Sequence, residues 1–98
     1  MNDKKMLSVT TDTGFHCEIE EDALDDMELL EAVMDLENSE PVTMVTGFRE
    51  VLELLLGEEQ KKALYAHIKA EHGRVKPSVL KDMLLQIFTR LGDSKKNL

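Results

Sequence analysis

Three side chains that could ligate a metal or move a proton lie close together in the segment LYAHIKAEHGRV, residues 64–75: His67, Glu71 and His72. On a helix, residues four apart share a face, so His67 and Glu71 would lie together while His72 would point elsewhere. Two ligands are fewer than the three protein ligands of a catalytic zinc site or the four of a structural one. The spacing therefore argues against a metal site, and leaves the pair of His67 and Glu71 as an open question.

The position of His72 also has a simpler interpretation. It comes directly before Gly73, a residue that often ends helices by adopting a positive φ. A histidine in the last turn interacts favourably with the negative end of the helix dipole. We therefore expect His72 and Gly73 to finish a helix.

Motifs of the common enzyme classes are missing from the sequence. It contains no HExxH, CxxC, GxSxG or GxGxxG motif and no P-loop. The single cysteine, Cys17, alternates with Phe15 and Ile19, which places it on the apolar face of a predicted strand. We predict a binding protein rather than an enzyme, with no catalytic residue, no cofactor and no resident metal ion.

The chain is acidic, but its charge is unevenly distributed. The net charge of the 98 residues is -8. Residues 1–57 hold 15 acids and 3 bases, whereas residues 58–98 hold 5 acids and 9 bases. The acidic balance argues against general affinity for nucleic acid, whose phosphates require cations. The asymmetry has two interpretations: copies that stack head to tail, or helix faces of different composition that simply face solvent.

The hydrophobic pattern predicts an α+β fold that is mainly helical, with an N-terminal β-hairpin (about residues 6–20) followed by about four short helices. We place these helices at residues 21–38, 41–57, 58–72 and 77–92. Residues 1–92 would form a single domain, and residues 93–98 a disordered tail.

Two details of this pattern can be tested directly. The first helix should carry an apolar stripe of Ala23, Met27, Leu30 and Met34, which Leu24, Leu29, Val33 and Leu36 widen, with acids crowding its first turns. Gly47 lies inside the second helix at a cost in helix propensity of about 1 kcal/mol. We expect it to be there because another helix passes close by.

The sequence also suggests where the protein works. The polar start MNDKKMLSVTTDTG is unlike a signal peptide, and apolar runs such as Leu54–Leu56 are far shorter than a membrane span. A lone cysteine suits a reducing compartment. We expect a cytoplasmic protein that does not enter membranes. Helices three and four could suggest a helix-turn-helix, but the last helix needs most of its positions for the core, so we expect no nucleic-acid binding.

Two segments, TGFHCEIEEDALDDMELLEAV and LLLGEEQKKALYAHIKAEHGRVKPSVLKDMLLQIF, resemble the tail assembly chaperone family of long-tailed (siphovirus-type) phages and prophages. The resemblance spans about residues 12–91, and EDALDDMELLE, LLGEEQ and GRV before an amphipathic helix are its most specific pieces. Met27 stands where related sequences would carry an aromatic residue. The resemblance implies a non-catalytic protein of the host bacterial cytoplasm that is absent from the mature virion. Its partners would be the tape measure protein and the tail tube protein, and many such chaperones self-associate.

Adaptable methionine side chains suit partners that offer long apolar helices. We therefore predict that Met27, Met34, Met44 and Met83 contribute to partner-binding or self-association surfaces, although each could instead pack in the core. The alternative function is a small acidic inhibitor, or a DNA mimic that blocks a host nucleic-acid-binding enzyme.

Overall fold

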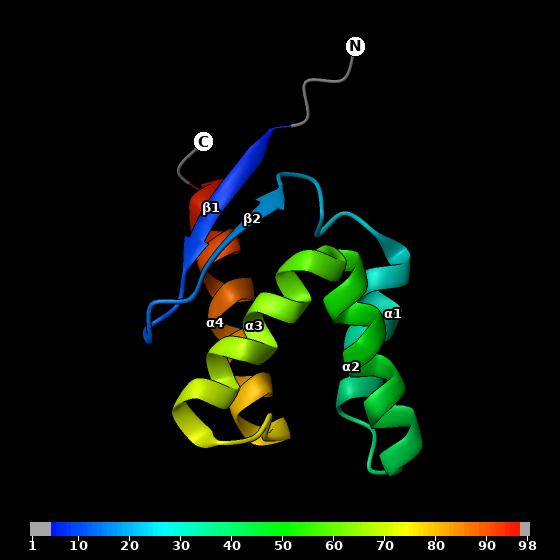
Figure 1. The fold of residues 1–98 in the computed structure, drawn as a ribbon. Helices are drawn as coiled ribbons and strands as arrows, with labels where there is room; N and C mark the ends of the chain where they lie inside the picture. The colour runs from blue at the N-terminus through cyan, green and yellow to red at the C-terminus, as the bar shows by residue number, and fades with distance from the viewer. Residues whose placement is uncertain (1–4, 97–98) are drawn as a thin grey trace.

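The N-terminal hairpin forms where apolar residues alternate with polar ones, and the helices form where apolar residues recur every three or four positions. The computed structural model describes the backbone of residues 5–96 and the side chains of residues 5–93. In chain order the elements are β1 (Met6–Thr10), β2 (His16–Glu20), α1 (Met27–Leu36), α2 (Pro41–Leu55), α3 (Gly57–His72) and α4 (Pro77–Lys96) (Figure 1). The predicted fold class, mainly helical α+β with an N-terminal hairpin, is confirmed.

The hairpin is antiparallel, and its register puts one apolar face on the helices. Val9 pairs with Cys17, and both side chains are buried. Gly14 makes the turn with a φ of 93°, a conformation that glycine adopts without steric cost. The neighbouring His16 lies on the exposed face. The predicted burial of Cys17 is therefore correct.

Helix α4 packs beneath β1 and contributes the most regular part of the core. As expected of a helix that gives most of its positions to the core, it buries Leu80, Met83, Leu84, Ile87 and Leu91. The predicted end of this helix at Gly92 is wrong, because α4 continues to Lys96. Gly92 is not among the positive-φ glycines and keeps the chain helical. Residues 93–96 of the predicted disordered tail are thus part of α4, and residues 97–98 lie outside the described range.

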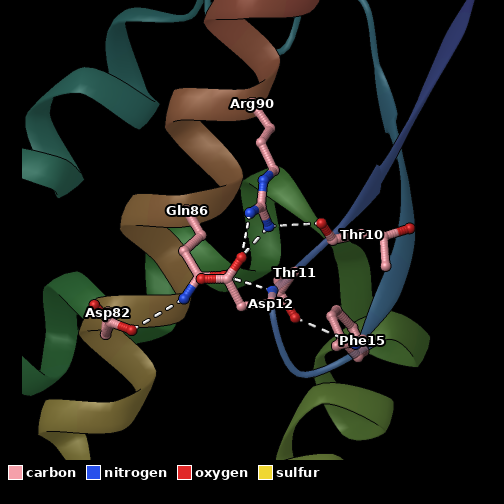
Figure 2. A network of polar contacts seen from close by, with 7 residues as sticks. All are labelled: Thr10, Thr11, Asp12, Phe15, Asp82, Gln86 and Arg90. Carbon is pink, nitrogen blue, oxygen red and sulfur yellow. Dashed lines mark hydrogen bonds and ion pairs between the residues drawn. The ribbon is translucent and has the colours of Figure 1, made fainter.

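A polar network ties the hairpin to α4 (Figure 2). The Arg90 guanidinium donates to the carbonyl oxygen of Thr10 at 2.6 Å and forms an ion pair with Asp12. The Gln86 side-chain oxygen accepts from the backbone N–H of Asp12 at 2.8 Å, and its amide group donates to Asp82 at 3.0 Å. The start of the hairpin turn is therefore held by two side chains one turn apart on α4.

Helix α3 holds the hairpin from the other strand. The Gln60 amide donates to the carbonyl oxygen of Glu18 at 2.8 Å, and its oxygen accepts from the Glu18 N–H at 2.7 Å. One side chain thus pairs with β2 as a neighbouring strand would. At its other end, α3 stops as predicted, because Gly73 adopts a φ of 79° and its N–H donates to Lys69.

Helix α1 differs from the prediction in both its start and its buried face. The residues from Glu21 to Asp25 form turns, and the helix begins only at Met27, with Asp26 accepting from the Glu28 N–H as its cap. Aspartates favour such local turns over a helix interior, which explains the late start. The buried residues are Leu29, Ala32 and Leu36, of which Leu29 and Leu36 belong to the widened stripe that the sequence predicts. The central stripe residues Met27, Leu30 and Met34 are instead 68%, 49% and 74% exposed.

Gly47 fixes this orientation of α1. A Cβ atom at Gly47 would lie 2.7 Å from the Cβ of Asp35 and 3.0 Å from the carbonyl oxygen of Ala32. Both distances are shorter than ordinary van der Waals contact, so α1 can lie against α2 only where α2 has no side chain. The predicted close helix approach at Gly47 is confirmed.

Replacing Gly47 with alanine should therefore lower stability even though alanine is the better helix former. We expect the free energy of unfolding to fall by about 1–3 kcal/mol, the usual range for overpacking. The matched control is Gly92→Ala in α4, where, apart from the helix's own backbone, no atom of the described residues lies within 4 Å of the added methyl group. This variant should gain up to about 1 kcal/mol. Urea unfolding followed by circular dichroism measures both, and an equal effect of the two substitutions would contradict the close approach.

The Cys17 thiol should be almost unreactive in the folded protein. Burial, with a smaller contribution from the nearby Glu18 carboxylate, raises the pKa of Cys17 from 9.0 to about 11. The neutral thiol is thus favoured, and the thiolate accumulates only as the pH approaches 11. We expect alkylation by iodoacetamide at pH 8 to be slower than in urea by at least about 100-fold, because only the thiolate reacts. Comparable rates in buffer and in urea would show that this strand is accessible.

Candidate functional site

The four methionines predicted to bind partners fall into two groups. Met27 and Met34 lie on the exposed side of α1, separated by two turns, with Leu30 between them. Met44 is partly buried and packs against the core, and Met83 is 3% exposed within it. The structure therefore brings Met27 and Met34 together with Leu30, and leaves Met83 no surface to offer a partner. We call Met27, Leu30 and Met34 the α1 stripe.

The α1 stripe is apolar but has acidic surroundings. Helix α1 contains Glu28, Glu31 and Asp35 and no basic residue. Glu31 lies one turn from both Met27 and Met34, so its carboxylate flanks the stripe. Large apolar side chains at such exposure often mark contact surfaces when they are contiguous. The chemistry of the α1 stripe therefore fits an apolar partner surface bordered by cations.

An acidic groove of about 580 Å³ adjoins the N-terminal end of the stripe. It lies where the turn before α1 meets β2 and the junction of α2 and α3. Its carboxylates are Glu18, Glu20, Asp22, Asp25, Asp26 and Glu53, and its exposed apolar side chains are Met6, Met27 and Leu54. No basic side chain is among the described residues that line it. Met27 belongs to both the groove and the α1 stripe, so the two surfaces are continuous.

The carboxylate of Glu18 illustrates how this groove keeps its charge. The Ser8 hydroxyl donates to it at 2.7 Å, and the His16 ring lies 2.9 Å away. These hydrogen bonds, with the Ser8 contact as the larger effect, lower the pKa of Glu18. Since a lowered pKa favours the ionised form, Glu18 stays charged at mildly acidic pH.

A second groove, shallow and basic, lies on the C-terminal half of α3. Its volume is about 520 Å³. Its lining combines the cations Lys62, Lys69 and Arg74 with Tyr65, Ala66, Gly73 and Val75. Positions 62, 65, 66 and 69 share one face of α3, and the positive φ of Gly73 turns the chain so that Arg74 and Val75 close the end. We call this surface the basic groove.

Tyr65 is the aromatic centre of the basic groove. Partial burial raises the pKa of its hydroxyl, against a smaller lowering by Arg49. The Lys61 ammonium lies 5.8 Å from the centre of its ring, within the range of a cation–π contact. Positive charges therefore lie near the ring, and the raised pKa keeps its hydroxyl neutral at physiological pH.

His67, the candidate ligand from the sequence, takes part in packing between α3 and the hairpin turn. Its Nε2 atom lies 2.9 Å from the Thr13 hydroxyl and 3.9 Å from a Glu71 oxygen. Its ring packs at a tilt against Phe15, with 5.7 Å between ring centres. Within residues 5–93, no three His, Cys, Asp or Glu side chains are placed to hold a metal ion. The geometry thus gives His67 a contact to the hairpin rather than a ligand set.

The sequence pattern did not reveal the basic groove. Lys62 and Lys69 are seven residues apart, and Tyr65 and Ala66 lie between them, so the helical spacing was visible. Arg74 joins them only through the reversal at Gly73, which periodicity cannot show. The acidic groove likewise depends on the packing of segments far apart in the chain.

The different exposures of Met83 and Met34 predict a large effect of truncation at one position and a small effect at the other. Met83→Ala should lower the free energy of unfolding by about 2–5 kcal/mol, because it leaves a cavity in the core. Met34→Ala should change it by no more than about 0.5 kcal/mol, as is usual for exposed positions. Thermal or urea unfolding measures both changes. A large loss at Met34 would mean that α1 is packed the other way round.

Comparisons with known proteins leave the function to be argued from these surfaces. No family model, curated protein or solved structure matches the chain. Among the helices of the described chain, none combines the length and apolar character needed to cross a membrane. The α1 stripe, the acidic groove and the basic groove are therefore the features on which a functional conclusion must rest.

Proposed function

We propose that the protein is a non-catalytic tail assembly chaperone of a long-tailed phage or prophage, which binds the tape measure protein during tail morphogenesis. The observation that carries the proposal is the α1 stripe. Met27, Leu30 and Met34 are between 49% and 74% exposed on a helix that also carries acids. The sequence resemblance to such chaperones supplies the identity of the partner.

The chemistry of the stripe agrees with such a partner. A tape measure protein offers long apolar helices, and an apolar helix face binds another through residues spaced by three, four and seven positions. The α1 stripe has this spacing, because its residues lie at positions 27, 30 and 34. Methionine side chains adapt to different apolar surfaces without a fixed fit. This suits a chaperone that holds several segments of one long protein.

The remaining parts of the proposal concern place and partners. The chaperone would act in the host bacterial cytoplasm and leave before the virion is complete, and the tail tube protein would be a second partner. Binding alone is enough for this role, so no side chain is assigned to catalysis.

A second candidate function rests on the acidic groove. Six carboxylates line it, and no described lining residue is basic. A small acidic inhibitor, or a DNA mimic, would present such a surface to the cationic site of a host enzyme. The two functions differ in the surface they use, since the first needs the α1 stripe and the second needs the carboxylates.

Co-expression tests the chaperone function directly. We expect the protein to keep apolar helical fragments of the tape measure protein in the soluble fraction of the cell lysate. The triple variant Met27→Gln, Leu30→Gln and Met34→Gln should lose this effect, because glutamine preserves helix propensity but removes the apolar surface.

The matched control is Val42→Gln with Val45→Gln, which removes two exposed apolar side chains of α2 outside the stripe. This control should solubilise the fragments as the unchanged protein does. If the stripe variant is as effective as the control, the α1 stripe is not the binding surface. If the unchanged protein and the control variant both fail to solubilise any fragment, the chaperone function is wrong.

A further inference from the structure

We propose that the basic groove of one copy binds the α1 stripe of a second copy, so that the protein covers its own exposed stripe by a head-to-tail contact. The first observation is that both surfaces are open to solvent in the described part of the chain, while Tyr65 and Val75 of the groove also pack partly against the core. The stripe residues stay exposed on α1, and the basic groove is open to solvent along α3.

The two surfaces are complementary in charge. The basic groove contributes Lys62, Lys69 and Arg74, and no acid is among the residues that line it. Helix α1 contributes Glu28, Glu31 and Asp35 and no base. Glu31 is exposed beside the stripe and can meet the cations when the apolar side chains are seated. Such complementarity favours this pairing over contacts between two acidic surfaces.

The α1 stripe and the basic groove also match in their apolar side chains and in their length. Tyr65, Ala66 and Val75 give the groove apolar surface on which methionine side chains can pack, and sulfur contacts aromatic rings favourably. Met27 to Met34 span about 10 Å of helix, and Lys62 to Gly73 span about 16 Å, at a rise of 1.5 Å per residue. The stripe therefore fits within the length of the groove.

The contact has to join two molecules. Helix α1 lies on one side of the fold, packed on α2, while the link from α3 to α4 that closes the groove lies on the other side (Figure 1). A surface that meets a different surface of the next copy makes a heterologous contact, which generates a ring or a filament. In this arrangement the acidic N-terminal part of one copy contacts the basic C-terminal part of the next copy, so all copies point in the same direction.

The contact also connects assembly with the proposed function. The α1 stripe cannot bind a partner helix while it is seated in the groove of another copy. Self-association and partner binding therefore exclude each other at this stripe. The contact rests on three apolar side chains and one shallow groove, so we expect weak association, with a dissociation constant on the order of 0.1 mM.

Sedimentation velocity of two complementary variants tests the contact. Met34→Lys disables the stripe but leaves the groove, and Lys69→Glu disables the groove but leaves the stripe; both positions are exposed. The unchanged protein should associate progressively as its concentration rises to roughly 1 mM. Each variant alone should be monomeric. Their equimolar mixture retains one intact contact and should form a species of twice the monomer mass.

The matched control is Lys5→Glu, which reverses a charge directly before β1. Lys5 belongs to neither the basic groove nor the α1 stripe, so this variant should associate as the unchanged protein does. Thermal unfolding of each variant confirms that it is folded. A monomeric mixture, association of either single variant to the same extent as the unchanged protein, or a strictly monomeric unchanged protein would overturn the proposal. Such results would leave the solubilisation experiment unaffected, because that experiment measures the stripe against a different protein.

Discussion

The attachment of the hairpin to the helices is the constraint on which the rest of the fold depends. A two-stranded hairpin is at best marginally stable alone in water, so Val9, Cys17 and Ile19 need a helical surface beneath them. Side chains from two helices hold the backbone of the hairpin in place. The Gln60 side chain of α3 forms hydrogen bonds with the backbone N–H and the backbone carbonyl oxygen of Glu18. On α4, Gln86 accepts from the Asp12 N–H and Arg90 donates to the Thr10 carbonyl oxygen, at the start of the turn. Because Gln60 satisfies Glu18, β2 offers no free hydrogen-bonding pair there to another strand.

The contact between α1 and α2 determines which side of α1 reaches solvent. At Gly47 no side chain separates the two backbones, and α1 packs with Ala32 and Asp35 over this position. Rotating α1 to bury Met27 and Met34 would move the small Ala32 away from this contact and bring a large side chain over α2. Exposure of the α1 stripe is thus a consequence of helix packing, and it places the candidate binding surface opposite the face that stabilises the fold.

Sequence reasoning succeeded where one residue type decides the outcome and failed where two solutions were equally periodic. Gly73 ends α3, and α4 buries its apolar face, because in each case one arrangement is much better than the others. In α1, apolar residues occur on almost every side, so both the stripe and the face with Leu29 and Leu36 had helical spacing. Tertiary packing on Gly47 chose between them. The two grooves combine segments that are distant in sequence, which no local pattern contains.

The helix dipoles help to decide which surface feature requires a functional explanation. The acidic groove lies where the N-terminal ends of α1 and α3 meet, as its lining by Asp26, Met27 and Gly57 shows. Carboxylates are stabilised at such positive helix ends, so much of this acidity has a structural cause. Lys69 likewise lies in the last turn of α3, where cations are favoured. No such effect accounts for the exposure of Met27, Leu30 and Met34. Apolar side chains gain nothing from a helix dipole, and the packing of α1 on Gly47 explains only which side of the helix faces solvent. The apolar character of that side is the feature that the proposed partner contact would explain.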